Sequence, residues 1–270
     1  MILVNGAEAD TITVHDRGLH YGDGLFETLA VVNGRPEDWA RHMRRLAGGC
    51  ARLGIPLPDP EQLQREALRV CEGPDRAVLK LIVTRGSGAR GYRPSRHSEP
   101  ARIVASYPWP EYPPSYAREG VVVRVCSTPL ACNARLAGIK HLNRLEQVCA
   151  RGEWEDPVIA EGLMLDTRGH VIEGTMSNLF IVRDGRLITP DVSECGVAGI
   201  MRERVLETAR EMGVPCEVTS VTLHAVKTAQ EAFLCNSIIN LWPVRELDGI
   251  QYPSNELTQR IAALVKQPET

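Results

Sequence analysis

Two spacings of apolar residues alternate along the N-terminal part of the chain, which predicts a mixture of strands and helices. Segments in which apolar and polar residues alternate predict strands at 2–6, 11–16 and 25–35. The first and the third of these contain Asn-Gly pairs, which are typical of tight hairpin turns. After Pro36 the apolar positions step by four and three residues, so a helix is expected to open there.

The same two patterns continue to the end of the chain. A second helix is expected at about 61–72, and the apolar run 77–86 predicts a strand that leads into the glycine-rich segment GSGARGY. Further strands are predicted at 120–128, within 162–190 and at 231–238. Further helices are predicted near 141–151, from Gly199 onwards and at about 254–266. This mixture predicts an α/β (α+β) protein.

The segment PWPEYPP, from Pro108 to Pro114, contains four prolines in seven residues. Proline fixes φ and removes a backbone donor, so this segment suits an extended linker better than a helix or an inner strand. A chain of 270 residues is long enough for two domains. We therefore expect a smaller N-terminal α/β domain at 1–107, a linker at 108–116 and a larger C-terminal domain at 117–270.

The charge and hydropathy of the chain narrow the classes of function. Its 31 Lys and Arg residues nearly balance 34 Asp and Glu residues, which gives no reason to expect a nucleic acid or an anionic membrane as a partner. No stretch approaches the ~20 consecutive apolar residues of a membrane-spanning helix, and no secretory signal is visible. The eight cysteines are scattered, without a CxxC pair, so we expect free thiols, no metal site and a cytoplasmic location.

Few residues are candidates for covalent chemistry or for anion binding. The lysines are only four: Lys80, Lys140, Lys227 and Lys266. The segment GVAGIMRERV begins a helix with glycine, where N–H groups and the helix dipole favour a phosphate. Glu173 lies on or at the end of a predicted strand, and Lys140 directly precedes a predicted helix. Each feature also has a plain structural interpretation: a helix entry, a solvated carboxylate and a solvated lysine.

Seven segments of the chain, in the same order, resemble the fold-type IV pyridoxal-phosphate (PLP) enzymes. They are DRGLHYGDGLFET, HMRRL, TRGSGARGY, GIKHLNRLEQ, EGTMSNLF, GVAGIMRERV and CNSIINLWPV. The family includes branched-chain and D-amino-acid aminotransferases and aminodeoxychorismate lyases, and GIKHLNRLEQ is similar to the lyase branch. The resemblance covers essentially the full length. It implies two α/β domains, the C-terminal one with a barrel-like sheet, and PLP in the cleft between them.

The resemblance assigns the covalent anchor and the ring partner of PLP to Lys140 and Glu173. Lys140 occupies the position of the amine that bonds to the cofactor aldehyde. Lys80 is the competing lysine in a motif-bearing region, but it lies in mid-strand and matches nothing in the family. Glu173 matches the carboxylate that keeps the pyridine nitrogen protonated, so that the ring can act as an electron sink.

For the cofactor phosphate, the resemblance implies Arg45 together with the backbone N–H groups of Ile200 and Met201. Periodicity alone does not choose between Arg44 and Arg45. Ser237 in the segment CNSI is a further candidate, as a hydroxyl donor.

The resemblance leaves two reactions to consider. In both, the released lysine removes a proton from the carbon that bears the substrate nitrogen. A transaminase returns that proton to the cofactor, whereas a lyase expels a group from the next carbon. The lyase branch implies conversion of 4-amino-4-deoxychorismate to 4-aminobenzoate and pyruvate, in folate biosynthesis, with Thr28 either as a second proton handler or as a structural strand residue. Phe26 argues against the D-amino-acid aminotransferases, which usually carry a tyrosine there.

That substrate has two carboxylates, so basic side chains are expected in its pocket. The candidates are His141, Arg144, Arg90 and Arg93, each of which could equally be an ordinary surface charge. The resemblance also implies a homodimer. Three alternatives stay open: an aminotransferase for D-amino or branched-chain acids, a PLP-binding protein without catalysis, and a structural α/β protein.

Overall fold

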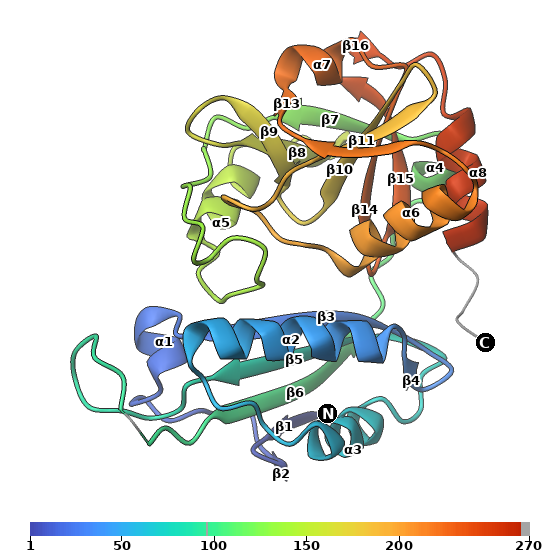
Figure 1. The fold of residues 1–270 in the computed structure, drawn as a ribbon. Helices are drawn as coiled ribbons and strands as arrows, with labels where there is room; N and C mark the ends of the chain where they lie inside the picture. Colours follow the sequence, from blue (N-terminus) through green and yellow to red (C-terminus); the bar gives the residue numbers. More distant parts are fainter. Residues whose placement is uncertain (96, 266–270) are drawn as a thin grey trace. The chain divides into compact units, whose positions relative to one another are not determined.

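The chain folds into two compact units (Figure 1). The computed structural model describes residues 1–95 and 97–265. The first unit consists of residues 1–110 and 139–143, and the second consists of residues 111–138 and the chain from residue 144 onwards. The division falls inside the proline-rich segment, while the role of 108–116 as a linker stays a prediction.

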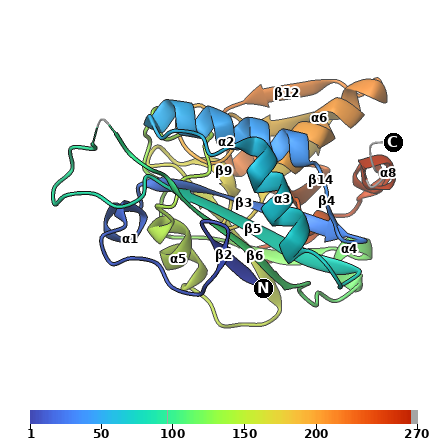
Figure 2. The same ribbon diagram turned by 90° about the horizontal axis from the view of Figure 1, so that it is seen from below.

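The first unit is a six-stranded sheet with two helices, α2 and α3, on one of its faces (Figures 1 and 2). The strands follow in the order β2-β1-β6-β5-β3-β4, and neighbouring strands are antiparallel. The elements are β1 (Ile2–Val4), β2 (Ala7–Glu8), α1 (Arg17–Tyr21), β3 (Gly24–Val32), β4 (Arg35–Pro36), α2 (Trp39–Leu53), α3 (Pro60–Val70), β5 (Arg76–Thr84) and β6 (Ala101–Pro108).

Two of the three strands predicted at the N-terminus form, and both lead into Asn-Gly hairpins. Asn5 and Gly6 have φ of 51° and 86°, and Asn33 and Gly34 have φ of 51° and 74°. Positive φ at both central residues is the geometry of the hairpin turn that Asn-Gly favours. The strand predicted at 11–16 is wrong. An alternating segment needs a neighbouring strand, and none of the described strands pairs with it.

A buried cluster of charged side chains anchors α2 to β3. Glu27, which is 1% exposed, accepts hydrogen bonds from Arg45 Nε at 2.9 Å and from Arg45 Nη2. The second carboxylate oxygen of Glu27 also lies 2.7 Å from His42 Nδ1. Leu29 and Val31, on the same face of β3, are fully buried. This face of the strand therefore forms the core beneath α2.

The second unit contains the remaining helices and strands that the structure describes. They are α4 (Ser115–Arg118), β7 (Val121–Val125), α5 (Leu145–Arg151), β8 (Ile159–Leu165), β9 (His170–Gly174), β10 (Asn178–Arg183), β11 (Arg186–Pro190), α6 (Ile200–Glu211), β12 (Cys216–Thr219), β13 (Val221–Thr222), α7 (Leu223–Lys227), β14 (Glu231–Asn236), β15 (Asn240–Leu247), β16 (Ile250–Gln251) and α8 (Glu256–Val265).

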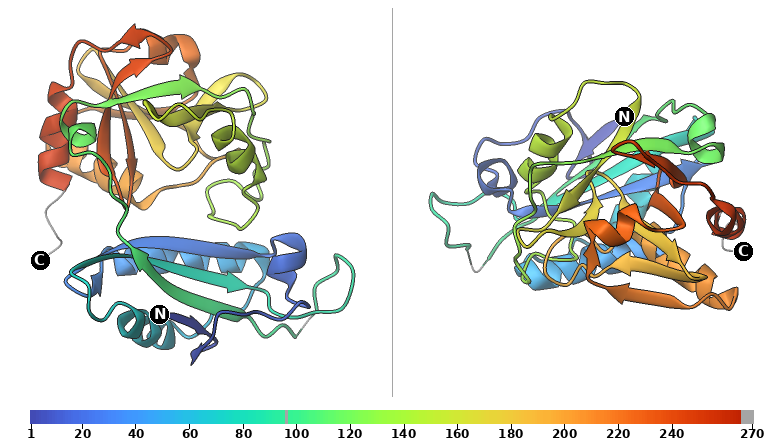
Figure 3. Two further views of the ribbon diagram at one scale, coloured as in Figure 1. Left: turned by 180° about the vertical axis from the view of Figure 1, so that it is seen from behind. Right: turned by 90° about the horizontal axis from the view of Figure 1, so that it is seen from above.

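Six of these strands form a closed ring in the order β10-β14-β15-β7-β8-β9 (Figure 3). The ring closes because β9 also pairs with β10, with Asn178 opposite Glu173. An apolar cluster that includes Leu234 and Trp242 fills the core, and α6 and α8 pack side by side against a second apolar cluster (Figure 1). The predicted barrel-like sheet is therefore confirmed.

Some predicted helix boundaries differ from the structure. The helix expected to open at Pro36 begins at Trp39, because Pro36 belongs to strand β4. The C-terminal helix predicted at about 254–266 is α8, and Lys266 lies outside the described residues. Within the part of the chain that the structure describes, no helix has the length and apolarity needed to cross a bilayer.

The first prediction concerns the buried ion pair beneath α2. Glu27→Gln should lower the free energy of unfolding by about 3–5 kcal/mol, because it removes the negative charge of a buried pair with Arg45. Urea unfolding of both proteins measures this difference. Glu61→Gln is the control: Glu61 and Arg65 are both well exposed, and this change should cost less than about 1 kcal/mol. Equal stability of Glu27→Gln and the wild type would contradict the role of the cluster.

The same cluster predicts a pH dependence of stability. Burial acts to raise the pKa of Glu27, but the charge and hydrogen bonds of Arg45 and His42 outweigh it and lower the pKa from 4.5 to about 2. A carboxyl with a depressed pKa contributes stability that is complete above pH 4.5 and is lost as the pH falls towards 2. The wild type should lose this contribution in that window, whereas Glu27→Gln should lack this part of the acid dependence.

Candidate functional site

The segment 139–143, which carries Lys140, lies along strand β3 of the first unit. Its backbone pairs with that of β3 through a 2.9 Å hydrogen bond from Phe26 N to Lys140 O and through a second bond two residues further on. The helix predicted near 141–151 therefore starts too early. Its first residues pair with β3 instead, and α5 begins at Leu145.

Two lysine amines lie against the ring of Phe26. Lys140 Nζ is 4.5 Å from the ring centroid, and Lys80 Nζ is 5.4 Å from it. Thr28 lies opposite Lys80 in the β3–β5 pairing, so Phe26, Thr28 and Lys80 share one face of the sheet. The predicted mid-strand position of Lys80 is confirmed, but the strand register brings its amine to the same ring as that of Lys140.

The structure distinguishes the two arginines that periodicity could not separate. Arg45 is half-buried, and its guanidinium is bound to the buried carboxylate of Glu27, whereas Arg44 is exposed. A guanidinium held by a carboxylate keeps a fixed orientation. Arg45 is therefore the better candidate for a phosphate, and that role stays a prediction.

The glycine-rich loop after β5 carries Arg90 and Arg93, and both are exposed. Arg17, which is 5% exposed, holds this loop. Its Nη1 donates to Gly91 O at 2.9 Å, and its Nη2 donates to Tyr92 O at 3.0 Å. A buried arginine thus fixes the backbone of a loop whose own basic side chains are exposed.

Glu173 lies on β9, at the point where the ring of strands closes, and is 4% exposed. Val197 N donates to its Oε2 at 2.8 Å, and Asn178 Nδ2 donates to Val197 O at 2.9 Å. A Cβ at Gly196 would lie 3.2 Å from Glu173 Oε2 and 2.7 Å from Ile172 Cγ2. The loop before α6 therefore packs directly against the carboxylate and holds it in place.

Helix α6 begins directly after this loop. Its N-cap residue is Gly199, so no N-cap side chain binds the first N–H groups of the helix, those of Ile200 and Met201. Such a helix start favours an anion through these N–H groups and the helix dipole. A Cβ at Gly199 would lie 2.0 Å from Asn178 Oδ1. The start of α6 is thus fixed against the residue that pairs with Glu173.

The remaining predicted residues occupy different places. Ser237 is half-buried in the turn after β14. His141 belongs to the segment that pairs with β3, where it forms a backbone bridge with Leu25. Arg144 is the N-cap residue of α5. Within the described residues, no group of three or more His, Cys, Asp or Glu side chains is arranged to hold a metal ion.

The structure sorts the candidates into two groups, one in each unit. The group in the first unit is Lys140, His141, Phe26, Thr28, Lys80, Arg45, Arg90 and Arg93. The group in the second unit is Glu173, Ile200, Met201, Ser237 and Arg144. Sequence reasoning missed Val197 and Asn178, which hold Glu173, although the quoted segments GVAGIMRERV and EGTMSNLF contain them.

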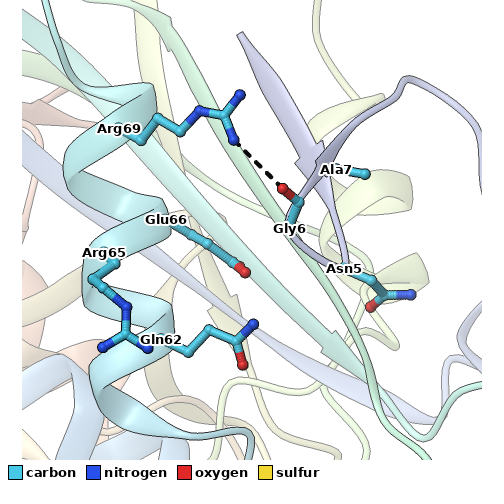
Figure 4. A pocket seen from close by; sticks show the side chains of 7 residues that line it. All are labelled: Asn5, Gly6, Ala7, Gln62, Arg65, Glu66 and Arg69. Carbon is cyan, nitrogen blue, oxygen red and sulfur yellow. Dashed lines mark hydrogen bonds between the residues drawn. The ribbon is translucent and has the colours of Figure 1, made fainter.

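A hollow on the surface of the first unit lies beside α3 (Figure 4). Arg69 donates to Gly6 O at 3.5 Å across it. Glu66, which also lines it, is already paired with Arg102 at 2.8 Å. Its lining is Asn5, Gly6, Ala7, Gln62, Arg65, Glu66 and Arg69. None of the predicted site residues is among them, so this hollow is separate from the candidate site.

Comparison with known proteins gives related sequences and structures. The Amino-transferase class IV family matches residues 24–247. Aminodeoxychorismate lyase of Vibrio harveyi is 35% identical over 267 residues, which cover 99% of this chain and 97% of that protein. The crystal structure of 4-amino-4-deoxychorismate lyase from Pseudomonas aeruginosa is 49% identical, covers 98% of both chains and has a TM-score of 0.95. Branched-chain-amino-acid aminotransferase of Escherichia coli strain K12 is 27% identical and covers 89% of this chain and 81% of that protein.

The close packing at the start of α6 can be tested with a single methyl group. Gly199→Ala should destabilise the protein by about 1–3 kcal/mol, because the added Cβ meets Asn178 Oδ1 and must displace an amide that is bound to Val197 O. Gly48→Ala is the matched control, since Gly48 lies in the middle of α2 and a Cβ there would have open space. This change should be neutral or stabilise by up to about 1 kcal/mol. Urea unfolding measures both, and equal stability of the two variants would contradict the packing described.

Proposed function

Since the chain belongs to the Amino-transferase class IV family, we propose that it is a PLP-dependent carbon–oxygen lyase that converts 4-amino-4-deoxychorismate to 4-aminobenzoate and pyruvate. The observation that carries this proposal is the 49% identity to the Pseudomonas aeruginosa lyase over 98% of both chains. The Escherichia coli aminotransferase, at 27% identity, is less similar to this chain than either lyase. The reaction belongs to the biosynthesis of folate.

The residues present fit pyridoxal 5′-phosphate. The amine of Lys140 lies against an aromatic ring and suits the cofactor aldehyde. Glu173 is a buried carboxylate held by a backbone N–H, as a partner of the ring nitrogen requires. The start of α6 has no N-cap side chain and suits the phosphate. Arg45 and Ser237 would add donors to that phosphate.

The proposed roles of the side chains follow from these positions. When bound, the cofactor supplies an aldehyde for covalent attachment and a ring that accepts the electron pair left after proton removal. Lys140 Nζ would anchor the cofactor through its aldehyde, and the same amine would remove the proton from C4 of the substrate. The carboxylate of Glu173 stabilises a proton on the ring nitrogen. Thr28, on the same sheet face as Phe26, would pass a proton to the enolpyruvyl oxygen as its bond to C3 breaks.

Substrate orientation is the main demand on the protein. Loss of the C3 ether forms an aromatic ring, so the chemical step is favourable once the C4 proton points towards Lys140. The basic candidates for the two substrate carboxylates are His141, Arg144, Arg90 and Arg93. Lys80 joins them, because its amine lies near the same Phe26 ring as that of Lys140.

The proposal also includes a homodimer and a cytoplasmic location, both of which the resemblance to the family implies. The oligomeric state can be measured by light scattering of the purified protein, and a monomer at all concentrations would exclude the dimer.

An aminotransferase for branched-chain or D-amino acids is the second candidate function. The similarity to the Escherichia coli aminotransferase supports it. Incubation with L-leucine or D-alanine and 2-oxoglutarate separates the two functions. Rapid amino transfer without formation of pyruvate and 4-aminobenzoate from aminodeoxychorismate would replace the lyase assignment.

The central test of the proposal is Lys140→Ala. We expect this variant to lose the yellow absorption band of the PLP-bound protein and nearly all formation of 4-aminobenzoate and pyruvate, because it lacks both the anchor and the base. In the wild type, borohydride reduction followed by peptide mass analysis should place the cofactor on the peptide that contains Lys140.

Lys227→Ala is the matched control, since Lys227 pairs with Asp248 at 3.9 Å near the end of α7 and has no place in the proposed mechanism. It should keep both the absorption band and the activity. Full retention of both by Lys140→Ala, or reduction products on another lysine, would remove Lys140 from the mechanism.

A further inference from the structure

Glu161 is a buried carboxylate on β8 that has no part in the proposed chemistry. It accepts an unusual number of hydrogen bonds. It is 1% exposed. Its Oε1 accepts from Gly162 N at 2.9 Å, from Thr175 N at 3.1 Å and from Thr175 Oγ1 at 2.5 Å. Its Oε2 accepts from Met176 N at 3.2 Å and from Ser177 Oγ at 2.8 Å. Three consecutive residues thus direct donors at one side chain.

These three residues form the turn between β9 and β10. Gly174 N donates to Ser177 O at 2.7 Å and closes the turn. A Cβ at Gly174 would lie 2.3 Å from Ser177 Oγ and 2.8 Å from Glu161 Oε2. The carboxylate therefore packs directly against the turn and fixes its shape.

The turn joins the two residues that close the ring of strands. Glu173 precedes it and Asn178 follows it, and these two residues are paired across β9 and β10. Asn178 Nδ2 binds Val197 O, and Val197 N binds Glu173 Oε2. Glu173, the turn, Asn178 and Val197 therefore form one closed circuit of covalent and hydrogen bonds, and Glu161 holds the turn of that circuit.

A carboxylate is needed for this arrangement, since both of its oxygens accept and hydrogen bonds to an ionised acceptor are the stronger kind. The amide of glutamine accepts with only one end. Glu161→Gln would turn an NH₂ group towards either the donors at Oε1 or those at Oε2. Two groups of donors would then face each other, and the turn would have to move.

We propose that Glu161 is a positioning residue that sets the affinity for PLP by holding Glu173 in place through the Thr175–Ser177 turn. This inference rests on the proposed function, in which Glu173 partners the cofactor ring. The proposed effect of Glu161 on the cofactor passes through the carboxylate of Glu173, so most of it should disappear when that carboxylate is absent.

The test is a double-mutant cycle on the affinity of the full-length protein for pyridoxal 5′-phosphate, measured by spectroscopic titration after cofactor removal. Glu161→Gln should weaken binding about tenfold. In the Glu173→Gln background the same change should weaken it by less than about twofold, because coupled residues are not additive.

Glu231→Gln is the matched control. Glu231 is 5% exposed and accepts from Leu257 N, Thr258 N and Thr258 Oγ1 at the start of α8, away from the circuit around Glu173. It should lower thermal stability, as Glu161→Gln does, but leave PLP affinity unchanged. If Glu161→Gln does not fold, Thr175→Val takes its place. This change deletes one hydrogen bond to Glu161 and should weaken PLP binding about threefold.

Three results would overturn the inference while the wild type binds PLP. They are wild-type affinity in Glu161→Gln or in its substitute Thr175→Val, an equal loss of affinity in Glu231→Gln, and a double variant whose loss equals the product of the two single losses. Failure of the wild type itself to bind PLP would instead overturn the proposed function, and the inference with it.

Discussion

Closure of the strand ring in the second unit depends on one pair of residues, Asn178 opposite Glu173. The proposed partner of the cofactor ring is therefore also part of the structural joint between β9 and β10. Val197 is bound by both residues of the pair, and Gly199 begins α6 directly beyond it. The carboxylate and the start of α6, the proposed phosphate site, are thus held in a fixed relation by a few short bonds.

The first unit fixes the proposed covalent anchor in a different way. The backbone at and directly after Lys140 pairs with β3, so the lysine projects from a strand-like segment. The strand itself is held under α2 by Glu27, Arg45 and His42. A buried charge cluster of this kind costs desolvation, but it also fixes one rotation of the helix relative to the sheet.

Local features of the sequence predicted those parts of the fold that local forces decide. The Asn-Gly hairpins follow from the need for positive φ, and the start of α6 follows from a glycine before an amphipathic segment. The roles proposed for Lys140 and Glu173 came from the resemblance, since each is an ordinary residue in isolation. The family and the barrel-like sheet implied by that resemblance are confirmed.

Errors and omissions arose where distant residues decide the outcome. Residues 11–16 alternate like a strand but lack a partner strand among those described, and the segment after Lys140 pairs with β3 before α5 begins. Lys80 was set aside because it lies in mid-strand and matches nothing in the family, and only the β3–β5 register places its amine beside Phe26. The donors to Glu161 are separated from it by up to 16 residues in the sequence, which is too far for a local sequence pattern to reveal.

Side chains along β3 alternate between two faces of the sheet, and the two faces serve different purposes. Glu27 and its odd-numbered neighbours face α2 and hold the unit together, whereas Phe26 and Thr28 lie on the opposite face, with the lysine amines. Phe26 and Thr28 are only half-buried, so mutations at these two positions can accumulate with little cost to folding. In such a strand, substrate preference is free to diverge during evolution while the scaffold is retained, which suits a fold shared by lyases and aminotransferases.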